Sequence, residues 1–255
     1  MVEICAIASG SNGNCYYIGN SMAAVLIDAG VSCRQVLLRM AAKGLKPKKV
    51  KAIFVTHEHT DHCCGVRVLS KTLDVPVYMT AGTCLGIRES FRPEDVREFA
   101  SDETIAIDGF AIHSFLKNHD AAEPCSFRIE YGGVSVGVFT DIGLPCNRVQ
   151  SHLALCHALF LETNYDEEML WTGNYPYFLK ARIASDYGHL SNHQAAELIR
   201  KHHHPGLQTV LLSHLSAENN RPEIAAKAFD ELKNRFNVAI TDRDAASEVY
   251  QVTGM

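Results

Sequence analysis

The sequence predicts an α/β fold, and three observations support this. Apolar, β-branched runs of strand length recur along the chain, with helix-periodic segments between them. Several of the apolar runs end in His or Asp, as in open α/β sheets whose chemistry lies at the carboxyl ends of the strands. A chain of 255 residues with 47% apolar and 21% charged residues has an ordinary globular composition. We therefore expect a single domain over residues 1–255.

The predicted elements follow from local pattern. We expect strands over residues 2–8, 15–18, 22–27, 51–56 and 75–79, helices over 32–43, 65–73 and 83–92, and a β-rich block over 104–139. Ser32 is the predicted N-cap of the first helix, because its hydroxyl can accept an N–H of the first turn. A second half of strands and helices follows from residue 145 to the end.

The segment His57-Glu58-His59-Thr60-Asp61-His62 carries most of the functional information. Four groups able to bind a metal fall within six positions, directly after the strand predicted over 51–56. Imidazole and carboxylate together suit zinc, manganese or iron, and a carboxylate among histidines indicates a hydrolytic site rather than a structural one. A polar surface loop that happens to contain three His is the alternative, and the spacing disfavours it. The sequence thus predicts a metal site at a strand end.

The spacing of His57, His59, Asp61 and His62 resembles the H-x-H-x-D-H signature of the metallo-β-lactamase superfamily. The resemblance implies an αββα sandwich with two metal ions at one edge of the two sheets. It also implies that the first two His bind one metal, and that the Asp and the last His bind the other. It does not identify the substrate, because this superfamily cleaves lactams, thioesters, lactones and phosphodiesters.

Three more residues stand just past apolar strands, in the order that the superfamily uses: His119, Asp141 and His214. His113 competes with His119, but it lies inside a strand and is better explained as a core or paired His. An anionic Asp between two cations would lower their repulsion, so Asp141 is the expected bridge. The implied ligand sets are His57, His59, His119 and Asp141 for one metal, and Asp61, His62, His214 and Asp141 for the other. Asp28 is expected to orient a ligand His without binding metal.

Two further segments are similar to the tRNA 3′-processing nuclease RNase Z. Gly188-His189-Leu190-Ser191-Asn192 places a His just before a helix that starts near Ser191, and Leu159-Phe160-Leu161-Glu162 places a Glu at a strand end. The resemblance implies that Glu162 holds His189, which would stabilise charge on phosphorus or protonate the leaving oxygen. Asp61 would both bind metal and accept the proton of the attacking water. A surface His at a helix start is the alternative explanation for His189.

The full set of motifs, from the Ser9–Asn14 turn to Leu212-Ser213-His214-Leu215-Ser216, is similar to the bacterial YycJ/WalJ family over nearly the whole chain. That resemblance implies a 5′-to-3′ exonuclease on double-stranded DNA, with a possible role in DNA repair. The cofactors would be two divalent ions, zinc or manganese, with iron not excluded. A small-molecule hydrolase of the same superfamily, acting as a cyclic phosphodiesterase, thioesterase or lactonase, is the first alternative. A non-catalytic metal-binding regulatory protein is the second, and the complete ligand set disfavours it.

The formal net charge of −5 argues against a broad phosphate-binding surface, so DNA would have to be gripped locally. One candidate is the turn that contains Ser9, Ser11, Asn12 and Asn14, which can form an anion-binding nest or a plain turn. Another is the segment before His189, which interleaves Lys180 and Arg182 with the aromatic residues Trp171, Tyr175, Tyr177 and Phe178. Ordinary helix packing explains that segment equally well.

Composition also bounds the location and the partners. The N-terminus begins directly in strand-like sequence, without a basic segment before an apolar run, which favours the cytoplasm. No apolar run reaches the ~20 residues of a membrane span. The nine cysteines form no C-x-x-C pair and are expected to be reduced. DNA is the expected partner, and no obligate protein partner is indicated.

Overall fold

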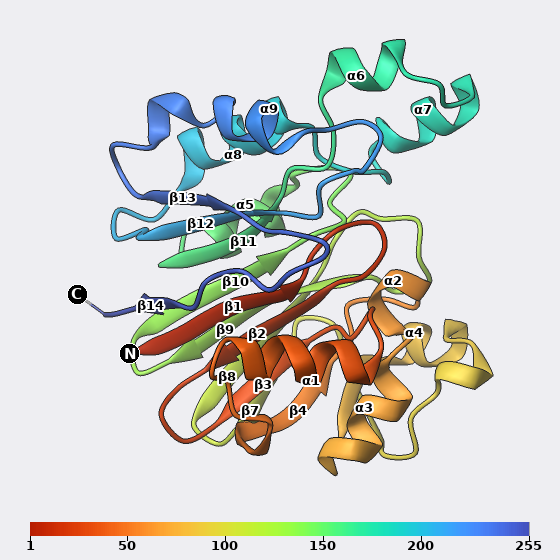
Figure 1. Cartoon of the computed structure of the whole chain (residues 1–255), viewed down its shortest axis with the longest axis vertical. Helices are drawn as coiled ribbons and strands as arrows, with labels where there is room; N and C mark the ends of the chain where they lie inside the picture. Colours follow the sequence, from red (N-terminus) through yellow and green to blue (C-terminus); the bar gives the residue numbers. More distant parts are fainter. Residues whose placement is uncertain (255) are drawn as a thin grey trace.

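The computed structural model describes residues 1–254 and has the predicted αββα architecture (Figure 1). Two mixed β-sheets pack face to face, and helices cover the outer face of each. Residues 2–99 build six strands of one sheet with its helices, and residues 104–240 build the other sheet. The C-terminal strand then returns to the first sheet beside the N-terminal strand.

The first sheet has seven strands in the order β14-β1-β2-β3-β4-β5-β6. Its strands are β1 (Val2–Ala8), β2 (Cys15–Gly19), β3 (Ala24–Ile27), β4 (Val50–Phe54), β5 (Val77–Thr80), β6 (Val96–Phe99) and β14 (Tyr250–Val252). β1, β2 and β3 form an antiparallel meander, and β3, β4, β5 and β6 run parallel to one another. The carboxyl ends of β3 and β4 therefore meet at one edge.

The second sheet also has seven strands, in the order β13-β12-β11-β10-β9-β8-β7. Its strands are β7 (Thr104–Ile107), β8 (Phe110–Leu116), β9 (Cys125–Tyr131), β10 (Val134–Phe139), β11 (Ala158–Glu162), β12 (Thr209–Ser213) and β13 (Asn237–Ile240). β10, β11, β12 and β13 are parallel, so the residues that follow them reach the same edge.

Nine α-helices and three short 3₁₀ helices connect the strands in the described part of the chain. They are α1 (Cys33–Ala42), α2 (Thr60–Cys63), α3 (Val66–Leu73), α4 (Ala81–Gly86), α5 (Asn147–Leu153), α6 (Glu167–Thr172), α7 (Tyr177–Ile183), α8 (Asn192–His202) and α9 (Pro222–Lys227), with 3₁₀ turns at Pro47–Lys49, Glu89–Phe91 and Asp230–Leu232. The predicted cap is confirmed: the Ser32 hydroxyl accepts the N–H of Gln35, which completes a capping box.

Three apolar cores hold the layers together. One lies between the sheets and contains Ile4, Tyr16, Phe54, Phe127 and Phe160. The second joins the first sheet to α1 and α3, and the third joins the second sheet to α5, α8 and α9. Because the inner strand β3 is buried on both faces, its sequence is apolar throughout instead of alternating, and β11 is likewise apolar up to Glu162 at its end.

One predicted helix is wrong. Instead of a single helix over 83–92, α4 ends at Gly86 and a 3₁₀ turn follows at Glu89–Phe91. Gly86 lies against the side chain of Glu58, where an added Cβ would come within 2.9 Å of that side chain. The close approach is tertiary, so local helical periodicity could not reveal it. β6 follows as an additional edge strand of the first sheet, which the sequence pattern did not predict.

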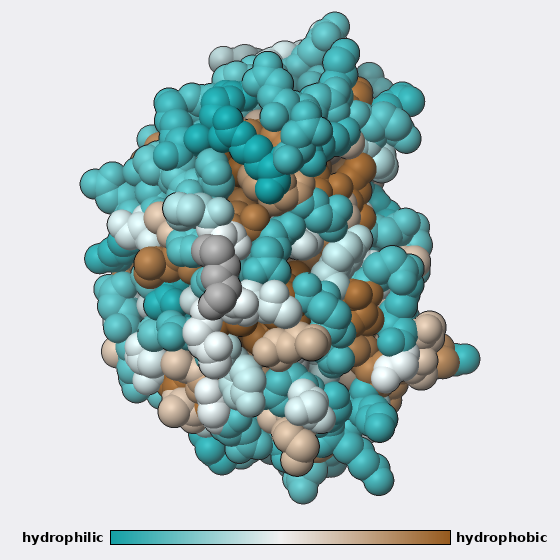
Figure 2. All heavy atoms as spheres, turned by 90° about the vertical axis from the view of Figure 1, so that its left-hand side faces the viewer, coloured by the Kyte–Doolittle hydropathy of each residue, from teal (hydrophilic) through white to brown (hydrophobic). Residues whose placement is uncertain are grey.

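Figure 2 shows the face that holds both termini, where hydrophilic residues dominate and apolar ones are interspersed. Within residues 1–254, every helix is too short or too polar to span a lipid bilayer.

Candidate metal centre

The loop after β4 carries the first group of ligands and is anchored by backbone hydrogen bonds. His57 follows the strand and is fully buried, and His59 is the N-cap of α2, which carries Asp61 and His62. The carbonyl of Asp61 accepts the N–H of Asn14 at 2.8 Å, and that of His62 accepts the N–H of Ala29 at 2.9 Å. The loop is thus held from two sides by the turns that follow β1 and β3.

Four overlapping groups of residues at this edge have ligand atoms close enough to share an ion: two are described next, and the other two are His57, His62 and Asp141, and Asp141, Glu162, His189 and His214. His57, His59 and His119 bring three ring nitrogens within 4.8 Å of one another, and so do Asp61, His62 and His214 with two nitrogens and a carboxylate oxygen. In the first group, Nε2 of His57 lies 3.0 Å from Nδ1 of His59. In the second, Oδ2 of Asp61 lies 3.3 Å from Nε2 of His62 and 3.5 Å from Nε2 of His214.

Asp141 lies between the two groups. Its Oδ2 is 3.3 Å from Nε2 of His62, and its Oδ1 is 3.4 Å from Nε2 of His214 and 3.8 Å from Nε2 of His119. Asp141 thus lies within 4 Å of ring nitrogens from both groups. The ligand residues expected from the sequence therefore converge, although they come from segments separated by up to 157 positions (His57 to His214).

Several of the candidate ligand atoms have no hydrogen-bond partner in the protein, as expected for atoms that bind a metal ion. Nε2 of His119, Nε2 of His214 and Oδ2 of Asp141 are buried and have no hydrogen-bond partner among the described residues. Buried polar atoms without partners are costly, at about 1–3 kcal/mol each. Imidazole nitrogens mixed with carboxylates suit zinc, manganese or iron. None of the clusters found among residues 1–254 includes a cysteine, and all nine cysteines are free thiols.

Asp28 contacts the second group through a ring of that group and through Thr56. Its Oδ2 accepts a hydrogen bond from Nδ1 of His62 at 2.7 Å. Its carboxylate also accepts hydrogen bonds from the backbone N–H and the hydroxyl of Thr56. These bonds point Nε2 of His62 toward the other ligands. His119 is oriented in the same way, because its Nδ1 lies 3.1 Å from the carbonyl oxygen of Gly188.

Glu162 ties His189 to the centre. Its Oε1 lies 2.8 Å from Nδ1 of His189 and 3.1 Å from Nδ1 of His214, and its Oε2 accepts the N–H of Ile142. Burial disfavours the ionised carboxyl, but the charges and hydrogen bonds of the two His outweigh burial and lower the pKa of Glu162 to about 2. Glu162 is thus an anion that holds both rings in place. His189 itself is 19% exposed and lies 3.7 Å from Oδ1 of Asp141.

The electrostatics of the second group follow from its carboxylates. Burial disfavours the protonated ring of His214, but Asp141, Asp61 and Glu162 raise its pKa to about 10. His119 faces fewer negative charges, and burial lowers its pKa to about 4. Burial likewise opposes the ionised form of Asp61, but His62 and His214 lower the pKa of Asp61 below its ordinary value.

The backbone at three of these residues is left-handed, with φ of 62° at Asp28, 55° at Asp141 and 59° at His214. Each follows the end of a parallel strand, and the sharp turn directs its side chain into the shared edge. Such conformations are uncommon for residues with a Cβ and cost about 1–3 kcal/mol each.

Sequence reasoning missed two residues at the centre. Lys117 is buried with its Nζ 2.8 Å from the carbonyl oxygen of Thr140 and 3.8 Å from Oδ2 of Asp141. The amide of Asn164 donates to the carbonyl of His214 at 2.9 Å. A signal for Lys117 existed, since it follows the apolar pair Phe115-Leu116 at the end of a buried strand, where a solvated lysine is unusual.

The candidate substrate contacts divide into buried and exposed groups. Ser9 and Asn14 are buried: the Ser9 hydroxyl accepts the N–H of His214 at 2.8 Å, and the Asn14 amide lies 3.2 Å from Nε2 of His62. They thus contact the ligands directly, whereas Ser11 and Asn12 are exposed at the tip of the turn.

The two candidate cations of the segment before His189 already have protein partners. Lys180 donates to the carbonyl of Trp171, and Arg182 pairs with Asp120, the residue after His119. His113 lies away from the centre, where its ring contacts the Thr104 hydroxyl at 2.8 Å, in agreement with its assignment as a paired His.

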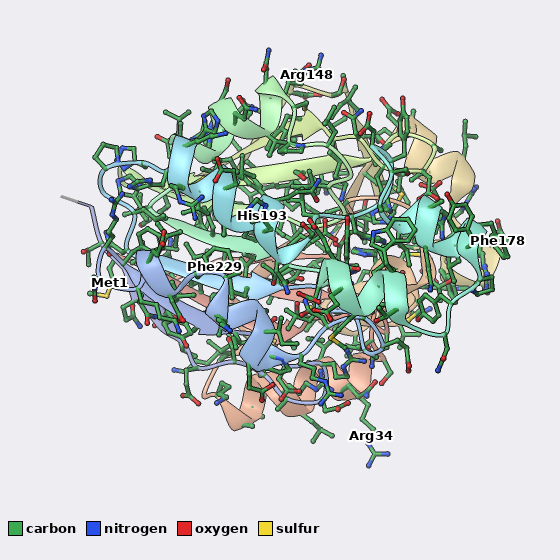
Figure 3. The ribbon with its side chains drawn as sticks, turned by 90° about the horizontal axis from the view of Figure 1, so that it is seen from above. Met1, Arg34, Arg148, Phe178, His193 and Phe229 are labelled. Carbon is green, nitrogen blue, oxygen red and sulfur yellow. The ribbon has the colours of Figure 1, made fainter. Side chains whose placement is uncertain are left out.

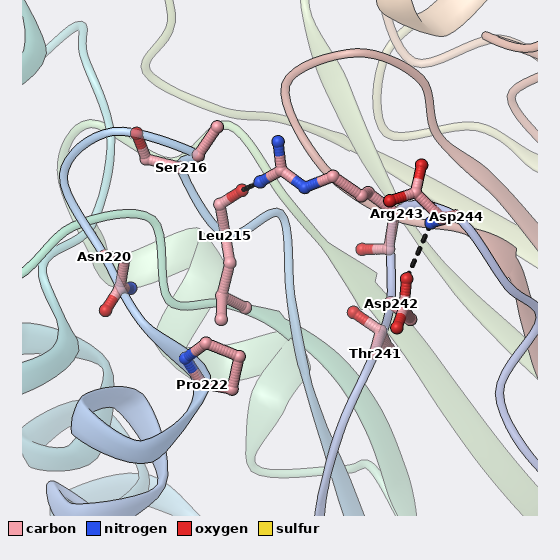
Figure 4. A pocket seen from close by; sticks show the side chains of 10 residues that line it. Leu215, Ser216, Asn220, Pro222, Thr241, Asp242, Arg243 and Asp244 are labelled. Carbon is pink, nitrogen blue, oxygen red and sulfur yellow. Dashed lines mark hydrogen bonds between the residues drawn. The ribbon is translucent and has the colours of Figure 1, made fainter.

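A cavity of about 390 Å³ adjoins the centre on the side of β12 (Figure 4). It shares Ser9 with the ligand network and is also lined by Leu215, the residue after His214. Arg243 crosses its mouth and donates to the carbonyl of Leu215 at 3.0 Å. None of the candidate ligand residues lines this cavity, so Ser9 is its link to the centre.

Comparison with known proteins agrees with this geometry. Residues 23–215 match the family described as "Beta-lactamase superfamily domain". The chain is 32% identical over 229 residues to exodeoxyribonuclease YycJ of Bacillus anthracis. This alignment covers 89% of this chain and 87% of the relative. It is 34% identical to exodeoxyribonuclease WalJ of Streptococcus pneumoniae, over 86% of this chain and 83% of the relative. The crystal structure of the metallo-β-lactamase fold protein YhfI from Bacillus subtilis superposes with a TM-score of 0.72 at 16% identity, covering 97% and 100% of the two chains.

The fold and the His/Asp edge define a metal-dependent hydrolase of the metallo-β-lactamase superfamily. Within it, the chain belongs to the family of YycJ and WalJ.

Proposed function

We propose that this protein is a 5′-to-3′ exonuclease on double-stranded DNA, dependent on two divalent metal ions. The observation that carries the proposal is the Glu162–His189 pair beside the two ligand groups, since a second acid–base group next to the metals suits a phosphodiester. The two curated relatives of nearly full length, both named exodeoxyribonucleases, support a DNA substrate. Zinc or manganese suits the ligand set, and a role in DNA repair would follow from the activity.

The residue roles follow from position. His57, His59 and His119 would hold one ion, Asp61, His62 and His214 the other, and Asp141 would contact both. Two ions so held would lower the pKa of a bound water and offset the charge of the phosphate. Asp61 suits a second role as proton acceptor, because its side chain is 25% exposed and stays ionised at neutral pH.

His189 would act on the phosphate or the leaving oxygen. Its Nδ1 is held by Glu162, which leaves Nε2 on the solvent-accessible side of the ring for the substrate. A protonated imidazole there would stabilise negative charge on phosphorus or supply the proton that the leaving oxygen needs. Ser11 and Asn12, exposed at the tip of the first turn, remain candidates for a neighbouring phosphate.

The test is cleavage of end-labelled linear duplex DNA by metal-stripped protein resupplied with manganese or zinc. We expect shortening from the 5′ end, absent in Asp61→Ala and reduced about 10²–10⁴-fold in His189→Ala. Metal content should stay unchanged in His189→Ala, which separates its role from ligation. Cleavage of bis-p-nitrophenyl phosphate without any attack on DNA would instead identify a small-molecule phosphodiesterase.

A further inference from the structure

The helices α6 and α7 form a hairpin (residues 166–183) that stands apart from the sandwich, on the side of the molecule that carries α2 (Figure 1). Unlike the other helices, this hairpin has an apolar cluster of its own, formed by Tyr165, Leu170 and Ile183 with three partly buried neighbours. It is thus held together internally, and its outward residues are not needed to cover a sheet.

The outward residues of this segment are aromatic. Trp171, Tyr177, Phe178 and the nearby Tyr187 are 46%, 76%, 74% and 59% exposed, and no other large aromatic side chain in residues 1–254 is comparably exposed. The rings of Trp171 and Tyr177 are neighbours, with centroids 6.1 Å apart. In the view from above, Phe178 lies at the far edge of the molecule, well away from the packed helix α8 that carries His193 (Figure 3). Exposed aromatics gathered on one segment indicate a binding surface.

This surface is tied to the metal centre at three points. The segment begins just after Glu162 and ends just before His189, which are hydrogen-bonded to each other. Arg182 of α7 pairs with Asp120, whose other carboxylate oxygen lies 3.5 Å from Nε2 of His119. The segment that carries these rings is therefore anchored at the centre through Glu162, His189 and Asp120.

The local charges determine which part of a nucleic acid suits the surface. Glu167 and Glu168 open α6, and the protein's own groups already engage Lys180 and Arg182. Backbone phosphates therefore gain little here, whereas the face of any base can stack on an aromatic ring regardless of sequence.

We propose that Trp171, Tyr177 and Phe178 form a stacking surface for unpaired bases at the end of a DNA strand entering the metal centre. The inference rests on the proposed nuclease function. Base stacking would thus take the place of the phosphate contacts by Lys180 and Arg182 that the sequence suggested. The contribution of stacking to affinity should depend only weakly on salt.

The chain contains one tryptophan, Trp171, so its fluorescence reports directly on this surface. The experiment titrates the metal-loaded protein with a duplex that has a short single-stranded overhang, made with phosphorothioate linkages that resist cleavage. A matched duplex carries abasic sites in the overhang. We expect the overhang with bases to quench Trp171 emission, and the abasic overhang to leave it unchanged.

Variants test the same surface without relying on fluorescence. Measured by anisotropy of labelled DNA, Tyr177→Ala and Phe178→Ala should each weaken binding of the overhang about 5- to 150-fold, the range expected for loss of one stacked base. Phe178→Tyr should restore binding. Leu155→Ala, at an aliphatic position that is 49% exposed outside this segment, is the control and should have no effect.

Equal quenching by the abasic duplex, or unchanged affinity in Tyr177→Ala and Phe178→Ala, would overturn the proposal, for example if the surface binds a protein instead. Its failure can be distinguished from failure of the proposed function. If metal-loaded wild-type protein shortens DNA but the variants bind the overhang normally, only the stacking surface is wrong. If no DNA is cleaved at all, the nuclease assignment is wrong whatever the binding result.

Discussion

Individual residues at the centre act through the atoms that orient them. Seven candidate ligand residues converge, and three of their rings have a partner on the other nitrogen: Asp28 for His62, Gly188 for His119 and Glu162 for His214. Such partners tune the ligand as well as hold it. The buried Lys117 places its ammonium group beside Asp141, and it is not part of any ligand motif.

Replacing Asp28 by Asn tests this support. The change keeps the size and the tolerance for positive φ, but it removes the charge that faces Nδ1 of His62. We expect affinity for one of the two ions to fall about 10- to 100-fold, measured by titration of metal-free protein. Asp74→Asn is the matched control, because Asp74 also has a positive φ but is exposed at the end of α3. Equal metal affinity in Asp28→Asn and wild type would contradict the supporting role.

At the scale of elements, strand ends and tight turns bring the site together. The loop over α2 docks on the turn after β3 at Gly30, where an added Cβ would lie 1.6 Å from the carbonyl oxygen of Asp61. No rotamer change relieves a clash with backbone, so the two segments would have to separate.

We therefore expect Gly30→Ala to destabilise the protein by several kcal/mol and to abolish metal binding, because Asp61 and His62 lose their anchor. Thermal unfolding and metal content are the measurements. Gly254→Ala, where an added Cβ meets its nearest neighbour only at 3.8 Å, should behave like wild type. A Gly30→Ala protein of normal stability with both ions bound would show that the loop tolerates displacement.

The packing of α5 on β8 makes stability depend on pH. His152 of α5 stacks on Phe115 with centroids 4.0 Å apart, and burial, aided by the positive charge of Arg128, lowers the pKa of His152 to about 4. The unfolded chain takes up this proton near the ordinary value of 6.5, whereas the folded chain does so only near 4. The stabilising contribution is therefore complete above pH 6.5 and is lost as pH falls toward 4.

His152→Gln should remove this part of the acid sensitivity. The difference in melting temperature between wild type and His152→Gln should shift in favour of the variant as pH is lowered from 7 to 4.5. His193→Gln, at an exposed position of α8, serves as the control and should follow wild type. Parallel pH profiles for wild type and His152→Gln would mean that this ring does not couple folding to pH.

For the whole molecule, the candidate metal site lies where the two halves of the sandwich meet. Ligands from the first half (residues 57–62) meet ligands at 119, 141 and 214, which follow strands of the other sheet. An ion that binds only this folded arrangement stabilises it by mass action, at about 2.7 kcal/mol per site at a hundredfold excess over Kd.

Chelation should accordingly lower the melting temperature of the whole chain in one cooperative step, and zinc or manganese should restore it, with a gain that rises with the logarithm of the ion concentration above Kd. Differential scanning calorimetry with and without chelator measures the effect. His214→Ala, which lacks a ligand from the second sheet, should gain less stability from added metal than wild type does. A melting temperature independent of metal would show that the ions do not bind preferentially to the folded state.

The sequence alone determined the α/β class, the strands from β1 to β5 and the metal motif, because strand periodicity and ligand spacing are local properties. The comparisons confirm the family that this motif implied. What only the tertiary structure decided is whatever depends on contacts between distant segments. The close approach of Gly86 to Glu58, the burial of Ser9 and Asn14 under the loop packed over them, and the exposure of Trp171, Tyr177 and Phe178 on a hairpin that packs on itself are all of this kind. Each of these features depends on contacts between residues that are far apart in the sequence, and the local sequence pattern does not encode such contacts.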